Sequence, residues 1–139
     1  MATQKDSTAL LLIVTALIEA PTGLVLLVSP PLVARILLGA ALDAPAALVV
    51  GRMAGAALFS LSGACWLARD EGPSRAVGGL VVALLLYNCA AVAVLARAAI
   101  SETMVGVLMW PVLALHTALA VWCLVCLRRG SVNAAAPTR

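Results

Sequence analysis

The chain alternates between four long apolar runs and short polar segments. The runs cover about residues 8–29, 46–68, 76–97 and 104–127. Each run reaches the roughly 20 residues that a helix needs to cross the hydrocarbon core of a bilayer. Backbone groups in lipid must find hydrogen-bond partners within their own segment, so each run is predicted to be a helix. The pattern therefore predicts an all-α, polytopic membrane protein with four transmembrane helices.

The connections between these runs are short, which favours a single domain over residues 1–139, folded as an up-down-up-down bundle. Pro30 and Pro31 are predicted to end the first helix, because proline lacks an N–H and clashes with the preceding turn. The stretch 31–44 is too short to span and carries Arg35 among apolar residues, so we expect an interfacial turn or short helix there. The first run is longer than the apolar part of a signal peptide and no A-x-A site follows it, so we expect it to stay as a membrane helix.

Composition supports the membrane class. Hydrophobic residues make up 64% of the chain and charged residues only 11%, whereas soluble domains are typically about 45–50% apolar and about 25% charged. The net charge of +3 comes from basic residues at the ends of the apolar runs, where they act as topology signals. We therefore expect the lipid bilayer as the main partner and no binding of nucleic acid.

The basic residues also predict an orientation. Four spans place both termini on one side of the membrane, and that side holds six basic residues against three on the other. The six are Lys5, Arg69, Arg75, Arg128, Arg129 and Arg139, and the three are Arg35, Arg52 and Arg97. The excess predicts that both termini are cytoplasmic. The preference for Arg over Lys and the abundance of Ala suit a GC-rich bacterial genome, so we expect a bacterial inner (cytoplasmic) membrane.

Glu19 is the only charged residue of the first run and lies near its middle. A carboxylate at the bilayer centre costs roughly 2.5–3.5 kcal/mol on insertion scales, so something must compensate for it. Counting depth at about 1.5 Å per residue places Tyr87, Asn88 and His116 within about one helical turn of Glu19. His116 is the only histidine and Tyr87 the only tyrosine of the chain. These four side chains are therefore predicted to form one polar layer near the bilayer midplane.

The first helix carries further polar and weak positions beside Glu19. Thr15, Glu19 and Thr22 share one helix face by their i, i+4, i+7 spacing. Pro21 removes a backbone hydrogen bond, and Gly23 loosens the same turn. Interrupted helices near the midplane are typical of the binding sites of transporters.

Two roles fit the polar layer. In the first it binds a ligand or a proton: Glu19 carries the charge, His116 tunes it, and Tyr87 and Asn88 orient the ligand. In the second, His116 donates a hydrogen bond to Glu19 or Asn88 and ties the bundle together, a contact that averages about 0.6 kcal/mol. The charge on Glu19 favours the first role, because a neutral side chain would tie helices at lower cost. Pro111 predicts a second kink, about one and a half turns from His116.

The second run combines a basic residue with a close-packing motif. Arg52 lies about one turn inside this run, where it either extends to the interface or points inward and neutralises Glu19. Gly51 and Gly55 form a GxxxG motif, which lets helices approach closely. The motif serves either packing inside the bundle or a homodimer contact.

All four cysteines lie inside the apolar runs. Cys123 and Cys126 form a CxxC motif at the cytoplasmic end of the fourth run, and Cys65 lies at the same end of the second. Cysteine behaves as a small hydrophobe, which favours simple packing, with a metal or redox site as the alternative. No pattern identifies a catalytic residue or a metal site, so an enzymatic role is not favoured and the cofactor is left open.

Two resemblances bear on function. The four-span layout, with Gly51-Arg52 opening the second span, resembles the small bacterial DoxX-like membrane proteins. Some members are accessory subunits of quinone-linked redox systems, which implies an accessory role. Residues 16–23, ALIEAPTG, are similar to the first helix of small multidrug resistance transporters, in which a lone membrane Glu exchanges protons for a cationic drug. That similarity implies the same role for Glu19.

The sequence thus predicts an integral membrane protein that binds or transports a small hydrophobic or cationic molecule, or a proton, at the polar layer. The alternative is a non-catalytic accessory or scaffold subunit of a membrane complex, possibly one linked to quinone redox chemistry. A homodimer or a larger complex is compatible with both.

Overall fold

The computed structural model describes residues 2–135, which form five helices and, within that range, no strand. The helices are α1 (Ala2–Val28), α2 (Pro30–Leu38), α3 (Pro45–Ala68), α4 (Arg75–Ser101) and α5 (Met109–Ala135). All except α2 are long and apolar enough to cross a membrane. The predicted all-α fold with four spans is therefore confirmed. Arg139, which entered the count of basic residues, lies outside the described residues.

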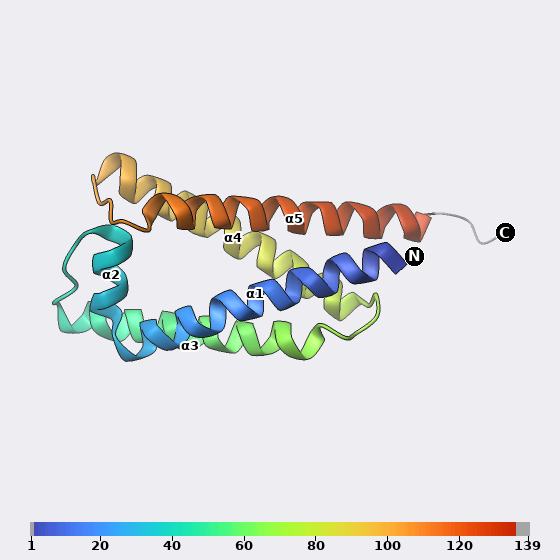
Figure 1. Ribbon diagram of the computed structural model, residues 1–139, viewed down its shortest axis with the longest axis horizontal. Coiled ribbons are helices and arrows are strands. Elements are labelled where there is room, and N and C mark those ends of the chain that lie inside the picture. The colour runs from blue at the N-terminus through green and yellow to red at the C-terminus, as the bar shows by residue number, and fades with distance from the viewer. Residues whose placement is uncertain (1, 136–139) are drawn as a thin grey trace.

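The spans form two antiparallel pairs (Figure 1). Helix α1 runs alongside α3, and α4 runs alongside α5. The pairs meet through α1 and α5, whereas α3 and α4 do not pack along each other. The start of α1 and the end of α5 lie at one end of the molecule, and α2 lies across the other end. The two pairs therefore leave a separation on the side of α3 and α4.

The fourth span begins at Met109, later than the predicted residue 104. The backbone N–H groups of Gly106 and Leu108 donate to the carbonyls of Leu37 and Ile36, each at 3.0 Å. These carbonyls belong to the last turn of α2, where no N–H group of the helix is in position to donate to them. Residues 104–108 therefore satisfy the end of α2 instead of extending α5.

The predicted kink at Pro111 is wrong. Pro111 falls in the first turn of α5, where a backbone N–H has no acceptor within the helix. Proline is tolerated at such positions because it removes no helical hydrogen bond. Pro21, in contrast, lies inside α1 as the sequence indicated.

Glycines set the close contact between α1 and α3. A Cβ atom at Gly23 would lie 2.6 Å from the backbone nitrogen of Phe59, and one at Gly55 would lie 2.7 Å from the carbonyl oxygen of Gly23. A Cβ atom at Gly51 would lie 2.9 Å from Cβ of Pro30. Both glycines of the GxxxG motif thus face neighbours in the same chain, and the motif packs inside the bundle.

Two apolar clusters fill the interior on either side of the polar layer. The larger cluster lies toward the start of α1 and consists of Leu11, Leu12, Ala16, Cys65, Val77, Val81, Leu84, Leu119, Cys123 and Cys126. The smaller cluster lies toward α2 and consists of Leu95, Ala98 and Met109. The polar side chains between these clusters are consequently held by packed layers above and below.

Candidate functional site

The structure brings the four predicted polar side chains together from three helices. Glu19 comes from α1, Tyr87 and Asn88 from α4, and His116 from α5. Each lies in the middle third of its span. Glu19 and Asn88 are only 2% and 1% exposed, His116 is buried, and Tyr87 is half-buried. The four side chains therefore lie at one level near the middle of the spans, as predicted.

Asn88 and His116 form the tightest contact of the cluster. His116 Nδ1 lies 2.8 Å from Asn88 Oδ1, and Asn88 Nδ2 donates to the carbonyl of Leu84 at 2.8 Å. Because the amide nitrogen of Asn88 is engaged by Leu84, its oxygen must accept from His116, which places a proton on Nδ1. In neutral His116 the Nε2 lone pair is then left for a further partner.

Glu19 is held more loosely. Tyr87 donates its hydroxyl to Glu19 Oε2 at 3.4 Å, which is long for a hydrogen bond. Glu19 Oε1 makes no hydrogen bond within the described part of the chain. A carboxylate offers about four lone pairs to donors, so most of its capacity is unused. The Tyr87 ring meets the His116 ring edge to face, with centroids 5.6 Å apart, and so joins the two contacts into one cluster.

A cavity of about 790 Å³ opens beside this cluster, between the two helix pairs. Its polar lining consists of Glu19, Thr22, Tyr87 and His116, and the rest of its lining is apolar. Small-molecule sites typically measure about 300–1,000 Å³ and combine apolar walls with a few polar groups. The cavity therefore has the size and lining of a binding site for a small, largely apolar molecule.

The predicted polar face of α1 divides between two environments. Thr22 lines the cavity, and its hydroxyl donates to the carbonyl of Ile18 at 2.7 Å. Thr15 is 1% exposed, and its hydroxyl has no partner within the described residues. Thr15 does not line the cavity, so only the Glu19–Thr22 part of this face belongs to the site.

Arg52 does not reach the site. Its side chain is exposed, it forms no ion pair with Glu19, and it does not line the cavity. Gly51 and Gly55 occupy the face of α3 that meets α1 and α2. Arg52 follows Gly51 by one residue, a rotation of about 100° around the helix, so it points off that face. Of the two orientations that the sequence left open for Arg52, the exposed side chain fits extension toward the interface, and the inward orientation that would neutralise Glu19 is not found.

The cysteines form no separate site. All four thiols are free, and Cys65, Cys123 and Cys126 pack in the larger apolar cluster, while Cys89 is exposed. The part of the chain that the structure describes holds no group of three or more metal-ligating side chains. Cys126 lies 3.7 Å from the hydroxyl of Ser7. The buried thiols thus pack as small side chains.

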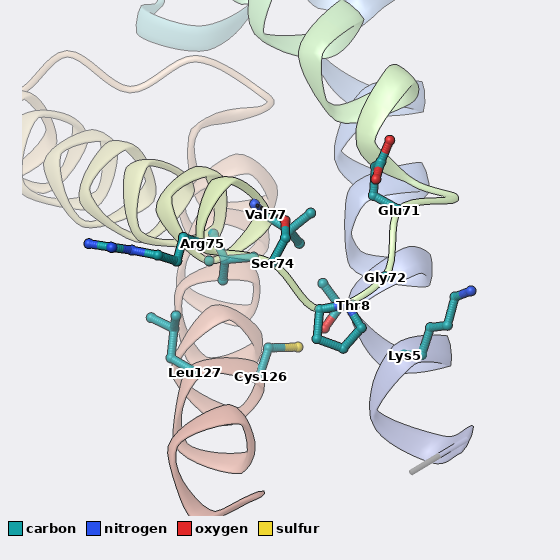
Figure 2. Close-up of a pocket in the computed structure, with 12 residues that line it drawn as sticks. Lys5, Thr8, Glu71, Gly72, Ser74, Arg75, Val77, Cys126 and Leu127 are labelled. Carbon is teal, nitrogen blue, oxygen red and sulfur yellow. Dashed lines mark hydrogen bonds between the residues drawn. The ribbon is translucent and has the colours of Figure 1, made fainter. Parts of the chain in front are cut away.

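A second cavity, of about 430 Å³, lies at the start of α4 (Figure 2). Lys5, Glu71 and Arg75 line it, but Figure 2 shows their charged ends pointing in different directions. Ser74 uses its hydroxyl to accept from the N–H of Val77 and so caps α4. The charged groups of this cavity do not converge on a common ligand, unlike the polar cluster at Glu19.

Sequence reasoning missed the apolar walls of the larger cavity. Helix α2 contributes Val33, Ile36 and Leu37, whose spacing marks one face of a short helix. Helix α3 contributes Leu58 and Leu61, and no sequence pattern distinguishes them from the other apolar residues of that span. Comparison of the chain with protein-family models, curated proteins and solved structures gives no match.

Proposed function

We propose that this protein binds a small, largely apolar molecule that carries a positive charge, with Glu19 as its counter-charge. The observation that supports this most is the unengaged Glu19 Oε1 beside an apolar cavity of about 790 Å³. A carboxylate kept in a membrane span favours a functional partner over a purely structural role. The similarity of residues 16–23 to small multidrug resistance transporters supports a cationic ligand as well.

Tyr87 and His116 complete the polar end of the cavity. The Tyr87 hydroxyl restrains Glu19 Oε2, and its ring gives a face on which a cation is attracted. His116 has Nδ1 engaged by Asn88, so Nε2 is left to accept from a donor group of the ligand. The same arrangement allows the ligand to be a protonated amine.

The decisive experiment removes only the charge of Glu19. Purified protein in lipid nanodiscs is titrated with tetraphenylphosphonium, a bulky apolar cation, by isothermal titration calorimetry. Two opposite charges about 4 Å apart attract by about 4 kcal/mol at an effective dielectric constant of about 20, so Glu19→Gln is expected to weaken binding by at least about tenfold. Glu102→Gln, which removes an exposed carboxylate outside the cavity, should bind as the wild type does.

Two results contradict the proposal: a wild-type protein that does not bind this cation, or a Glu19→Gln variant that binds it equally well. The second result would favour the structural alternative, in which the polar layer ties helices within an accessory subunit. The Asn88–His116 contact supports that alternative, because it joins α4 to α5 through Asn88, which does not line the cavity.

We also propose that the protein resides in a bacterial inner membrane with both termini in the cytoplasm. The end of the molecule where α1 begins carries more basic residues than the end where α2 lies, and cytoplasmic ends are typically the more basic. The former are Lys5, Arg69, Arg75, Arg128 and Arg129, and the latter are Arg35, Arg52 and Arg97. Alkaline phosphatase fused to the C-terminus should be inactive, and a green fluorescent protein fused there should fluoresce. An active phosphatase would reverse the orientation.

A further inference from the structure

We infer that the ligand reaches the cavity sideways from the bilayer, between α3 and α4, and is an amphiphilic cation that dissolves in lipid. The route follows from the cavity walls, while the positive charge of the ligand rests on the proposed function.

The end of the cavity toward α2 is closed by packed chain. Helix α2 covers it with Val33 and Ile36, and residues 104–108 are fastened to α2 by two backbone hydrogen bonds of 3.0 Å. Gly39 allows this fit, because it has a left-handed φ of 67° and a Cβ atom there would lie 2.9 Å from the carbonyl oxygen of Val105. Behind this cover lies Met109, which is fully buried. Water on that side of the membrane therefore has no direct path to Glu19.

The end toward the start of α1 is closed by the larger apolar cluster. Leu11, Leu12 and Leu84 in that cluster are all but completely buried. Leu61 and Leu115, which line the cavity, pack against the same cluster and so form the floor beside Glu19. A hydrated ion would have to displace this packed layer to reach the carboxylate.

Two of the four lateral sides are closed along the cavity, because α1 and α3 touch through Gly23 and Gly55 and α4 packs along α5. Helix α1 meets α5 nearer its start, where Trp122 of α5 donates to the hydroxyl of Ser7. Helices α3 and α4 do not pack along each other. On this open side the cavity is edged by small or exposed side chains, with Ala54 and Ala57 on α3 and Val94 on α4. These positions lie within the spans, so the opening faces lipid.

The distribution of polar groups indicates how the ligand lies. Glu19, Tyr87 and His116 gather at the polar layer, whereas the part of the lining contributed by α2 and Leu108 is apolar. An amphiphile would place its cationic group at Glu19 and extend its apolar body toward α2. A small hydrated cation gains nothing from the apolar wall, and the few acceptors of the polar layer would replace only part of its hydration shell.

The lateral route can be tested without any ligand. Single cysteines for spin labelling are introduced one at a time into a Cys89→Ala background. Ala91→Cys places the label on the cavity wall. Two reference positions are Val121→Cys on the lipid-facing side of α5 and Arg75→Cys at the membrane surface. The remaining thiols are buried and should not react in the folded protein. Electron paramagnetic resonance then compares collisions with oxygen, which concentrates in lipid, and with a water-soluble nickel chelate.

We expect the label at Ala91→Cys to resemble that at Val121→Cys, with frequent oxygen collisions and few nickel collisions. Nickel collisions as frequent as at Arg75→Cys would show a route from water and overturn the inference. Rare collisions with both reagents would show a closed cavity and overturn it equally. None of these outcomes depends on Glu19 or on ligand binding.

The class of ligand is tested with two cations of equal charge. Tetraphenylphosphonium should bind at least tenfold more tightly than tetramethylammonium in wild-type nanodiscs. Equal affinities would overturn the assignment of an amphiphile. If neither cation binds, the proposed function is contradicted, while the lateral route is still decided by the spin-label experiment.

Discussion

Asn88 fixes the orientation of His116: Oδ1 of Asn88 lies 2.8 Å from Nδ1 of His116, while its amide nitrogen donates to Leu84 at 2.8 Å. Asn88 does not line the cavity. The expectation that it orients the ligand directly is therefore replaced by a positioning role, in which it holds the imidazole that does face the cavity.

Removing the Asn88 side chain should destabilise the protein through His116. Asn88→Leu leaves the buried Nδ1–H group without an acceptor, so we expect a loss of about 1–2 kcal/mol in the free energy of unfolding. Combined with His116→Leu in a double-mutant cycle, the coupling should be about 0.6 kcal/mol and at most about 1.7 kcal/mol. Unfolding in mixed micelles, followed by circular dichroism, measures both quantities.

Thr117→Val is the matched control for this cycle. Its hydroxyl is exposed and donates only to the carbonyl of Leu113 in its own helix. It should show no coupling to Asn88→Leu. Strict additivity between Asn88→Leu and His116→Leu would mean that the contact contributes nothing to stability.

Tyr87→Phe should weaken cation binding slightly without unfolding the protein. The hydroxyl donates to Glu19 over 3.4 Å, so its contribution lies at the weak end of the range for hydrogen bonds, at about 0.5–1 kcal/mol. This corresponds to a roughly two- to fivefold weaker affinity for tetraphenylphosphonium. The ring and its contact with His116 are retained. A loss as large as that of Glu19→Gln would show that the hydroxyl, rather than the carboxylate, is the principal group for the ligand.

The sequence allowed the spans and the polar layer to be predicted because both depend on position along single helices. Apolar length defines a span, and depth follows from counting residues at a constant rise. Glu19, Tyr87, Asn88 and His116 were brought together in this way, although which of them bond to one another was left open. His116 pairs with Asn88, and Tyr87 pairs with Glu19.

Features that depend on how helices pair could not be predicted. Gly55 of α3 lies against Gly23 of α1, more than thirty residues earlier in the sequence, and no local sequence pattern predicts that pairing. The late start of α5 arises because Gly106 and Leu108 bond to α2, a contact between distant segments. The cavity has the same origin, since it is the space left where α3 and α4 do not pack.

Thiol labelling should separate the exposed cysteine from the buried ones. In folded protein, N-ethylmaleimide, which enters membranes, is expected to modify Cys89 alone, because Cys65, Cys123 and Cys126 are buried. After unfolding in detergent, all four cysteines of the chain should react. Mass spectrometry of the intact protein counts the labels. Rapid modification of Cys123 or Cys126 in the folded state would contradict their packing in the larger cluster and reopen a redox role for the CxxC motif.

The α1–α3 contact should tolerate no added atom at its glycines. In Gly23→Ala the new Cβ would lie 2.6 Å from the backbone nitrogen of Phe59, and backbone cannot move aside as a flexible side chain can. Overpacking of this kind costs about 1–3 kcal/mol, so the midpoint of thermal unfolding should fall clearly. Gly63→Ala, on the same helix as Phe59, has no atom within 4 Å of the new Cβ and should be neutral or slightly stabilising. If both variants unfold alike, α1 and α3 are not held as closely as the glycine contact requires. The helices would then be as free to separate between α1 and α3 as between α3 and α4.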